Sequence, residues 1–407
     1  MGFSNKFFKA IAIDAGNRNS IAKYSKECDV PVVRLRYYND NNIVPTGGDL
    51  DRVLSVSGIT EVELMLRMGR LNKNVLEAIQ GNAGKISKML EDHEVEREPH
   101  VPVKPVYETS FGKLYEGDCI SLMREIESDT VDLIFADPPF NLKKLYPSNI
   151  DDNLKTEQYI NWCHEWLTEC VRILRHGGSL FVWNLPKWNA ALASFLDGRL
   201  NFMYWIAVDI KYSLPIRGRL YPSHYSLLYY TNGERPRVFH PDRLPMLICP
   251  HCYGDLKDYG GYKDKMNPRG VNLSDVWGDI PPVRHAKYKR RNGANELSLK
   301  LLDRIVELST DEGDLVFDPF GGSGTTYMAA ELKSRCWIGV EIGPTEDIIN
   351  RFGRINQERA ILDDYRKNLN SLFPEDALKQ RVRVGLWTCE SVRDKKKHGQ
   401  APLFEID

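Results

Sequence analysis

The tetrapeptide Asp137-Pro138-Pro139-Phe140 has the most distinctive chemistry in this chain. Two consecutive prolines fix φ and remove two backbone donors, so the segment is a rigid bend that presents a carboxylate, bare carbonyl oxygens and one aromatic face. This combination suits a planar ring with an exocyclic amine. The amine would donate to Asp137 and to a backbone carbonyl, while Phe140 stacks on the ring. The alternative is a strand-ending turn made rigid by proline.

A second, glycine-rich stretch reads Asp318, Pro319, Phe320, Gly321, Gly322, Ser323, Gly324 and Thr325. Its glycines let a cofactor approach the backbone closely, and the helix expected at 327–333 offers free N–H groups at its start. The apolar segment 336–340 follows and ends in Glu341. An acid about 20 residues beyond a glycine-rich turn is where nucleotide-binding folds hold ribose hydroxyls.

Apolar runs directly before both motifs predict the strands that position them. Residues 131–136 precede Asp137, and residues 314–317 precede Asp318. Such runs are typical of buried parallel strands, and open α/β sheets bind ligands at the carboxyl ends of their strands. We therefore expect the two motifs to meet at one crevice. An aromatic-rich helix is expected at 159–174, with its tryptophans in the core.

With both motifs in this order, the chain resembles the S-adenosylmethionine-dependent DNA amino-methyltransferases. It looks like the permuted group, in which the Asp-Pro-Pro-aromatic motif precedes the glycine-rich motif. The resemblance covers residues 107–355 and implies an α/β, Rossmann-like methyltransferase fold with a mostly parallel, doubly wound sheet. It also implies direct in-line methyl transfer to adenine N6 or cytosine N4 in DNA, with the base flipped out of the duplex. Asp137 favours adenine, because the cytosine enzymes of this resemblance more often have Ser at that position.

The resemblance also suggests roles for individual residues. The expected catalytic residues are Asp137, Pro138, Pro139 and Phe140. The expected cofactor-binding residues are Asp118, Lys300, Asp318, Phe320, Gly322, Ser323, Gly324, Thr325 and Glu341. Two positions depart from the family pattern. The family commonly starts the helix that enters its cofactor half with a His-Pro-x-x-Lys-Pro run, and this chain keeps only Lys300 of that run. In the catalytic motif, Phe140 replaces the commoner Tyr.

Residues 1–90 are expected to form a small, mainly helical N-terminal module. A β-like run occupies 32–38, and short helical patterns occupy 50–56, 61–68 and 73–79. The helices resemble a helix-turn-helix bundle whose third helix would enter DNA. That helix carries little positive charge, so a packing or dimerisation bundle is the favoured interpretation.

The rest of the chain divides by its composition. A proline-dotted linker is expected at 91–106, a methyltransferase domain at 107–355, and a C-terminal helix and tail at 356–407. The segment 231–294 is irregular and falls where the family carries its target-recognition insert.

The insert contains a basic run and a cysteine pair. The basic run predicts contact with DNA phosphates and stacking on an exposed base, the alternative being a solvated loop. Its candidate residues are Arg284, Lys287, Tyr288, Lys289, Arg290 and Arg291. Cys249 and Cys252 have the spacing of half a zinc site, but no second pair follows nearby. Zinc is therefore one interpretation, and a tight turn with two reduced thiols is the favoured one.

Composition limits the partners and the compartment. The 407 residues carry a net charge of −1, so any nucleic-acid binding needs a local basic surface. The chain has no apolar stretch of membrane-spanning length and no secretory segment, and its eight cysteines are scattered. These features predict a cytoplasmic protein with no membrane partner, and the resemblance implies that it associates with the nucleoid through DNA.

The resemblance leaves several further expectations open. It implies double-stranded DNA as the substrate, and it allows a cognate restriction endonuclease and a homodimer. One rival function is an RNA or protein methyltransferase, but the known enzymes of that kind place the glycine-rich turn before an Asn-Pro-Pro-Tyr motif. Another is a non-catalytic DNA-binding regulator that uses the N-terminal module.

Overall fold

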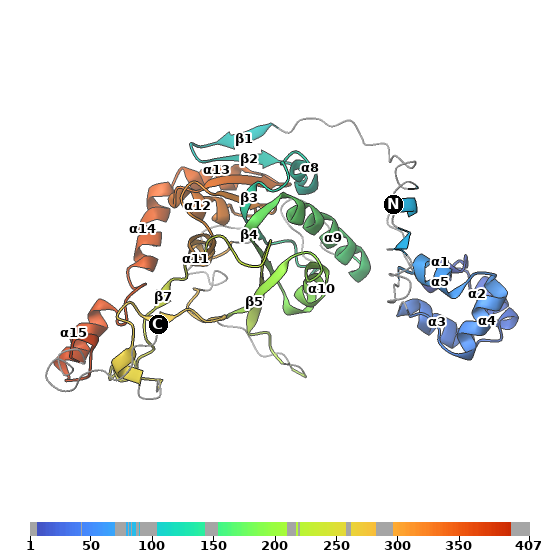
Figure 1. Ribbon diagram of the computed structural model, residues 1–407, viewed down its shortest axis with the longest axis horizontal. Helices are drawn as coiled ribbons and strands as arrows, with labels where there is room; N and C mark the ends of the chain where they lie inside the picture. Colours follow the sequence, from blue (N-terminus) through green and yellow to red (C-terminus); the bar gives the residue numbers. More distant parts are fainter. Residues whose placement is uncertain are drawn as a thin grey trace. The chain divides into compact units, whose positions relative to one another are not determined.

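The computed structural model describes residues 6–41, 43–69, 79, 81–82, 84–86, 89, 104–142, 154–209, 217–218, 220–257, 262–281 and 296–391. The chain divides into two compact units, Met1–Pro102 and Val103–Asp407 (Figure 1). The predicted helix at 73–79, apart from Ile79, lies outside the described residues. The whole basic run from Arg284 to Arg291 also lies outside them.

The described residues of the N-terminal unit form helices joined by turns, and they include no strand. Its helices are α1 (Phe7–Ala10), α2 (Arg18–Glu27), α3 (Val32–Asp40), α4 (Gly48–Ser57) and α5 (Glu61–Arg67). The helices predicted at 50–56 and 61–68 are confirmed as α4 and α5. The β-like interpretation of 32–38 is wrong, because this run forms most of α3.

The error at 32–38 has a physical cause. Valines and tyrosines favour strands when their propensity is considered alone, but propensity yields to packing. Leu35 and Tyr38 lie three residues apart, which places them on one helical face, and both are buried against Phe7. Pro31 stands just before the first helical residue, where its missing N–H removes no helical hydrogen bond.

The second unit is built on a nine-stranded mixed sheet in the order β1-β2-β11-β10-β3-β4-β6-β5-β9. The long strands are β1 (Pro105–Glu108), β2 (Gly112–Glu116), β3 (Val131–Ala136), β4 (Leu174–Asn184), β5 (Asn201–Asp209), β6 (His224–Thr231), β10 (Leu315–Asp318) and β11 (Cys336–Glu341). The five central strands, from β2 to β4 in this order, are all parallel to their neighbours. The predicted Rossmann-like fold is confirmed.

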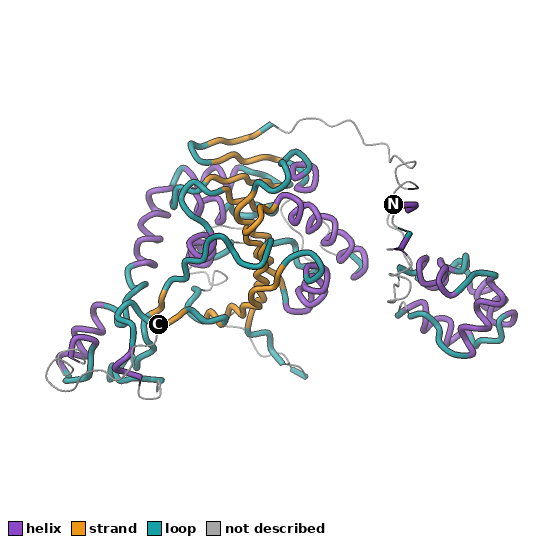
Figure 2. Tube along the Cα trace, viewed as in Figure 1, coloured by secondary structure: helices purple, strands orange, loops and turns teal. Residues whose placement is uncertain are grey.

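Helices cover both faces of the sheet (Figure 2). One face packs on α8 (Cys119–Met123), α9 (Thr156–Ile173) and α10 (Pro186–Leu196). The other packs on α11 (Leu299–Ser309), α12 (Thr325–Leu332), α13 (Glu346–Phe352) and α14 (Ile355–Arg366). Strand β3 shows why both faces are apolar. Its Leu133 and Phe135 enter one core while Ile134 and Ala136 enter the other, as the alternation of a strand requires.

The segment expected as the insert is irregular where it is described. It holds β7 (Arg243–Leu244), the short helix η1 (Tyr262–Lys265), β8 (Val271–Asn272) and β9 (Val276–Trp277). Met246 of this segment forms a small apolar cluster with Leu372 and Phe373, and this cluster packs beside α15 (Glu375–Arg383).

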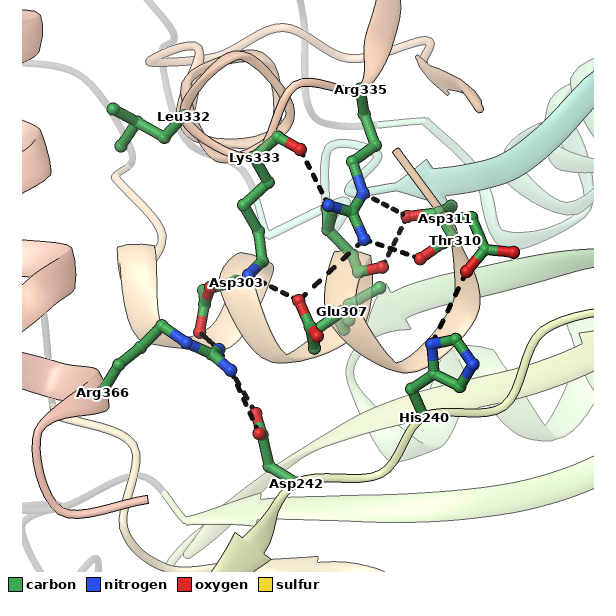
Figure 3. Close-up of polar contacts among 12 residues, drawn as sticks. His240, Asp242, Asp303, Glu307, Thr310, Asp311, Leu332, Lys333, Arg335 and Arg366 are labelled. Carbon is green, nitrogen blue, oxygen red and sulfur yellow. Dashed lines mark hydrogen bonds and ion pairs between the residues drawn. The ribbon is translucent and has the colours of Figure 1, made fainter. Parts of the chain in front are cut away.

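Buried charges attach the beginning of this segment to the body of the unit (Figure 3). Arg366 of α14 lies between two buried acids, 2.7 Å from Asp303 Oδ2 on α11 and 3.1 Å from Asp242 Oδ1 beside β7. Lys333 adds a second cation 3.2 Å from Asp303 Oδ1. Buried carboxylates need such partners, because an unpaired buried charge costs several kcal/mol.

A second ion-pair group attaches the far end of the segment to the same helix. Asp279 follows β9 and receives both guanidinium nitrogens of Arg304, at 2.9 and 2.6 Å. Lys300 Nζ lies 2.7 Å from the same carboxylate, and these cations hold the pKa of Asp279 far below its usual value despite its burial. Asp279 is thus paired directly with α11, and Asp242 is joined to α11 through Arg366 of α14.

Candidate active site

Four acids converge at the carboxyl ends of neighbouring parallel strands. Asp137 follows β3, Asp318 ends β10 and Glu341 ends β11, while Asp118 comes two residues after β2. The strands are in direct register, with Phe317 opposite Ile134 and Glu341 opposite Glu116. The sequence prediction that the two motifs meet at one edge of the sheet is confirmed.

The carboxyl ends of the neighbouring strands β3 and β10 form a topological switch point. The chain leaves β3 toward α9 on one face of the sheet and leaves β10 toward α12 on the other. A crevice opens where consecutive connections diverge in this way, and ligands of doubly wound sheets bind there. Asp137 and Asp318 therefore stand on the two sides of the same crevice.

Two hydrogen bonds hold the Pro-Pro bend. Tyr159 Oη donates to the Pro139 carbonyl at 2.7 Å, and Trp188 Nε1 donates to the Phe140 carbonyl at 2.7 Å. Asn184 Nδ2 in turn donates to Tyr159 Oη at 3.0 Å. Among the described residues no donor reaches the carbonyl of Pro138, so this oxygen is the acceptor left open beside Asp137.

Tyr159 and Trp188 were not recognised as site residues from the sequence. Tyr159 begins the aromatic-rich helix that was predicted to pack in the core, and Trp188 lies on α10, for which no helix was predicted. Both side chains are buried. The available signal is chemical: a buried Tyr or Trp usually finds a partner for its polar atom, and a bend rich in free carbonyls is such a partner.

Replacing Trp188 with phenylalanine is expected to lower the turnover number by roughly 10- to 100-fold, because the Phe140 carbonyl loses its donor and the bend loses its position. The Michaelis constant for the cofactor should change little. Trp205→Phe is the matched control, since Trp205 packs in the same core and donates no hydrogen bond within the described residues. Steady-state kinetics of both variants make the test, and equal losses would show a packing effect only.

Phe140 contributes an aromatic surface to the crevice. Its ring is partly exposed and lies 5.9 Å, centroid to centroid, from Tyr225, which lies 4.8 Å from Trp183. Side chains of three different strand or loop segments thus form one aromatic wall. A planar ring entering beside Asp137 would find a stacking face already in place.

The carboxyl groups at the switch point are unusual in their ionisation. Burial raises the pKa of Asp137 well above its ordinary value, and the nearby Asp318 raises it further. Burial also raises the pKa of Asp318, to about 8, although hydrogen bonds from Thr326 and the Phe320 amide act in the opposite direction and Glu341 adds to the rise. Within the described part of the chain, no Lys or Arg forms an ion pair with Asp137 or Asp318. These two carboxyl groups are therefore available to pair with a cationic ligand.

These raised pKa values predict how the stability of the cofactor-free protein depends on pH. A carboxyl whose folded pKa is raised binds its proton more tightly in the folded state. The stability that it contributes is full below the unfolded pKa near 4 and is lost as pH rises through about 8 for Asp318. Asp318→Asn should flatten the decline in unfolding free energy between pH 5 and 9, measured by urea titration. An unchanged decline would show that Asp318 ionises normally.

The glycine-rich turn is shaped by close contacts. Gly324 has φ +71°, and a Cβ there would lie 2.7 Å from the Ile348 side chain. At Gly321 a Cβ would lie 3.0 Å from both Tyr327 Oη and the Val340 carbonyl. The amides of Gly322 and Gly343 donate to the two oxygens of Glu341, at 2.6 and 2.9 Å. These hydrogen bonds fix Glu341, the acid predicted to bind ribose, in place beside the glycine-rich turn.

Arg351 stabilises the glycine-rich turn by hydrogen bonds, and the sequence did not predict this role. It is 3% exposed, donates to Thr325 Oγ1 at 2.6 Å and to the Ser323 carbonyl at 3.2 Å, and pairs with Glu358 at 3.0 Å. The side chains of Ser323 and Thr325 are consequently turned into the protein. An arginine on α13, outside both motifs, offers no local signal of this role.

The remaining predicted cofactor residues have different surroundings. Phe320 packs edge-on against Trp166 at 5.2 Å, which ties the turn to α9. Asp118 is exposed and caps α8 by accepting from the Ser121 amide at 2.8 Å. Lys300 is engaged by Asp279, so its charge serves the anchoring of the insert described above.

The cysteine pair lies in an exposed turn. Cys249 N donates to the Gly254 carbonyl at 2.9 Å, and the amides of Cys252 and His251, with the Cys252 side chain, lower the pKa of the Cys249 thiol. Over the described ranges, no three His, Cys, Asp or Glu side chains are grouped to hold a metal ion. No helix within these ranges is long and apolar enough to cross a membrane.

A Rossmann-like sheet with an Asp-Pro-Pro-aromatic bend and a glycine-rich turn at its switch point is the arrangement of an enzyme with a nucleotide-type cofactor. Comparison with known proteins specifies the class. The model of the DNA methylase family of N6 and N4 methyltransferases matches residues 131–349. The chain belongs to this family, and the predicted cofactor, S-adenosylmethionine, is confirmed with it.

The similar proteins include several bacterial modification enzymes. The chain is 46% identical over 363 residues to the type II methyltransferase M.BamHI of Bacillus amyloliquefaciens, covering 88% of this chain and 86% of that protein. It is 30% identical over 232 residues to M.HpaI of Haemophilus parainfluenzae, covering 56% and 70%. Among solved structures, the PvuII cytosine-N4-specific DNA methyltransferase aligns with a TM-score of 0.46 at 20% identity, covering 63% and 94%.

Proposed function

We propose that this protein transfers the methyl group of S-adenosylmethionine to an exocyclic amine of a base in double-stranded DNA, as the modification enzyme of a type II restriction-modification system. The proposal depends on two adjacent acceptors, the Asp137 carboxylate and the Pro138 carbonyl, because the hydrogen bonds that hold the bend engage only the next two carbonyls. They lie across the switch point from the glycine-rich turn, which a hydrogen bond joins to Glu341. The family description, DNA methylase, supports the DNA substrate, and the similarity to type II methyltransferases supports the restriction-modification setting.

The residues present fit the cofactor. Glu341 keeps lone pairs for ribose hydroxyls while two backbone amides orient it. The partly buried Asp137 and the buried Asp318, which have no cationic partner among the described residues, suit a positively charged sulfonium. When bound, the cofactor supplies an electrophilic methyl group on a good leaving group. The protein must therefore mainly position the amine.

Positioning follows from the Pro-Pro bend. The base amine donates one hydrogen to Asp137 and the other to the Pro138 carbonyl, which directs the nitrogen lone pair out of that plane toward the methyl group. Phe140 stacks on the ring, which requires a base rotated out of the duplex. Once the new N–C bond forms, the amine loses one proton. Asp137 is suited to accept it because burial raises its pKa.

Both base amines satisfy this geometry, because adenine N6 and cytosine N4 present the same two donors. We favour adenine, since Asp at the head of the motif is typical of the adenine enzymes. Methylation of mixed-sequence DNA followed by nucleoside mass spectrometry is the test, with N6-methyladenine expected. N4-methylcytosine would overturn the choice of base and keep the mechanism, and transfer to RNA or protein alone would overturn the DNA assignment.

We further propose that residues 231–294 read the target sequence, with the basic run 284–291 on the DNA backbone. The support is a set of ion pairs that joins this segment to α11, directly from Asp279 to Arg304 and, for Asp242, through Arg366 of α14. Just before α11 begins, the Leu297 carbonyl accepts a hydrogen bond from Thr325 Oγ1 of the glycine-rich motif at 3.3 Å. The segment that reads the DNA and the glycine-rich turn would then both be attached at α11. A cytoplasmic enzyme, a cognate endonuclease and a homodimer remain parts of the proposal.

A further inference from the structure

Helices α2 and α3 form a helix-turn-helix at a place the sequence did not suggest. Four residues, 28–31, join the two helices, as this motif requires. Asp29 takes the left-handed conformation within the turn, at φ +50°. Arg52 on α4 donates to the Asp29 carbonyl at 2.9 Å, and Ser25 Oγ donates to the Val30 carbonyl at 2.6 Å. The turn is therefore held from both sides.

The inner face of the pair fixes the direction of α3. Tyr24 and Cys28 of the first arm, Val30 of the turn, and Leu35 and Tyr38 of α3 are all buried in one core. Hydrogen bonds add to this packing, because Tyr24 Oη donates to the Val53 carbonyl at 3.2 Å and Tyr38 Oη to Asp49 at 2.7 Å. Helix α3 thus packs its buried face against the rest of the unit and exposes its opposite face to solvent.

The outward face of α3 has the chemistry of a base-reading surface. Val33 is 79% exposed and Tyr37 56% exposed, and Arg36 is exposed between them. These positions lie on one side of a helix at spacings of three and four residues. Apolar side chains of this kind contact thymine methyl groups, and arginine binds guanine edges or phosphates. The face carries no acid before Asp40 at its C-terminal end.

Charge distribution favours DNA over a protein as the partner. Residues 6–41 contain seven Lys and Arg against four Asp and Glu, whereas residues 43–69 contain two against four. The exposed cations Lys23 and Lys26 lie on α2, the helix that crosses the backbone when α3 enters a major groove. One buried acid on α4, Asp49, is already paired with Arg34.

We propose that α2 and α3 bind duplex DNA as a second reading site, separate from the methylation site, with Val33, Arg36 and Tyr37 in the major groove. This places the reading helix at 32–40, in the run interpreted above as β-like, and not at 73–79. The proposal is independent of the methyl-transfer function, since it concerns the other compact unit of the chain.

The test compares two full-length double variants. Arg36→Ala with Tyr37→Ala removes the proposed contacts, and Val62→Ala with Leu66→Ala removes a comparable exposed apolar pair on α5, where these residues are 48% and 46% exposed. Affinity for random-sequence duplex DNA should fall at least about tenfold in the first variant only, and its salt slope should fall by about 1. Selection from the random pool should lose one enriched sequence in that variant while keeping the methylated one.

Other results would overturn the proposal. Equal DNA affinity in the first variant and the wild type would do so, as would equal losses in both variants. A change in self-association without a change in DNA affinity would identify a second copy as the partner. Thermal melting checks that both variants fold, and tritium transfer to DNA in the same samples keeps a failure of catalysis distinguishable from a failure of this site.

Discussion

Replacing Asp137 with alanine is expected to lower methyl transfer to DNA by about 10³-fold or more, because the amine loses both its acceptor and the group that takes its proton. Cofactor affinity should stay within about tenfold, since Glu341 and the glycine-rich turn are unchanged. Single-turnover transfer of a labelled methyl group, with calorimetry for cofactor binding, measures the two effects separately.

Two further variants make this result specific. Asp137→Asn keeps one acceptor oxygen but cannot take a proton, so it should lie between alanine and the wild type. Asp364→Ala removes an exposed acid on α14 and should leave the rate unchanged. If Asp137→Ala lost cofactor binding and catalysis together, Asp137 would be a structural residue of the crevice, and the proposed mechanism would be wrong.

Replacing Arg351 with methionine is expected to lower the free energy of unfolding by about 3–5 kcal/mol and to weaken cofactor binding. The change leaves Glu358 charged and buried without its partner, and it removes the donor to Thr325 and Ser323 in the turn. Urea titration and calorimetric cofactor binding are the measurements. Because the turn is displaced, the loss of affinity should appear even at temperatures where the variant is folded.

A double variant separates stability from positioning at this site. Arg351→Met with Glu358→Met replaces the buried pair by apolar side chains, so much of the stability should return while the cofactor affinity stays low. Lys379→Met is the control, since it breaks an ion pair whose side chains are both 67% exposed and should change the stability little. Recovery of affinity in the double variant would contradict a positioning role for Arg351.

Much of the active site was predictable from the sequence because its signals are local. Buried parallel strands are typically near-continuous apolar runs, so 131–136, interrupted only by Asp132, and 314–317, apolar from Leu315, could be recognised as strands. The glycine-rich turn could be recognised because φ +71° at Gly324 is a conformation that other residues rarely adopt. The rules of parallel sheets then place both motifs at the carboxyl ends of neighbouring strands.

Other features depended on contacts between distant parts of the chain. Tyr159 and Trp188 reach the Pro-Pro bend from helices that looked like ordinary core, and Arg351 reaches the glycine-rich turn from 26 residues away. Helix α3 went against its own strand-like composition because the core around Phe7 required a helical face. Backbone sterics and apolar periodicity are written into neighbouring residues, so the sequence alone determined the strands, the bend and the turn. The partner of a buried polar atom is chosen by packing in three dimensions, so only the tertiary structure decided what holds them in place.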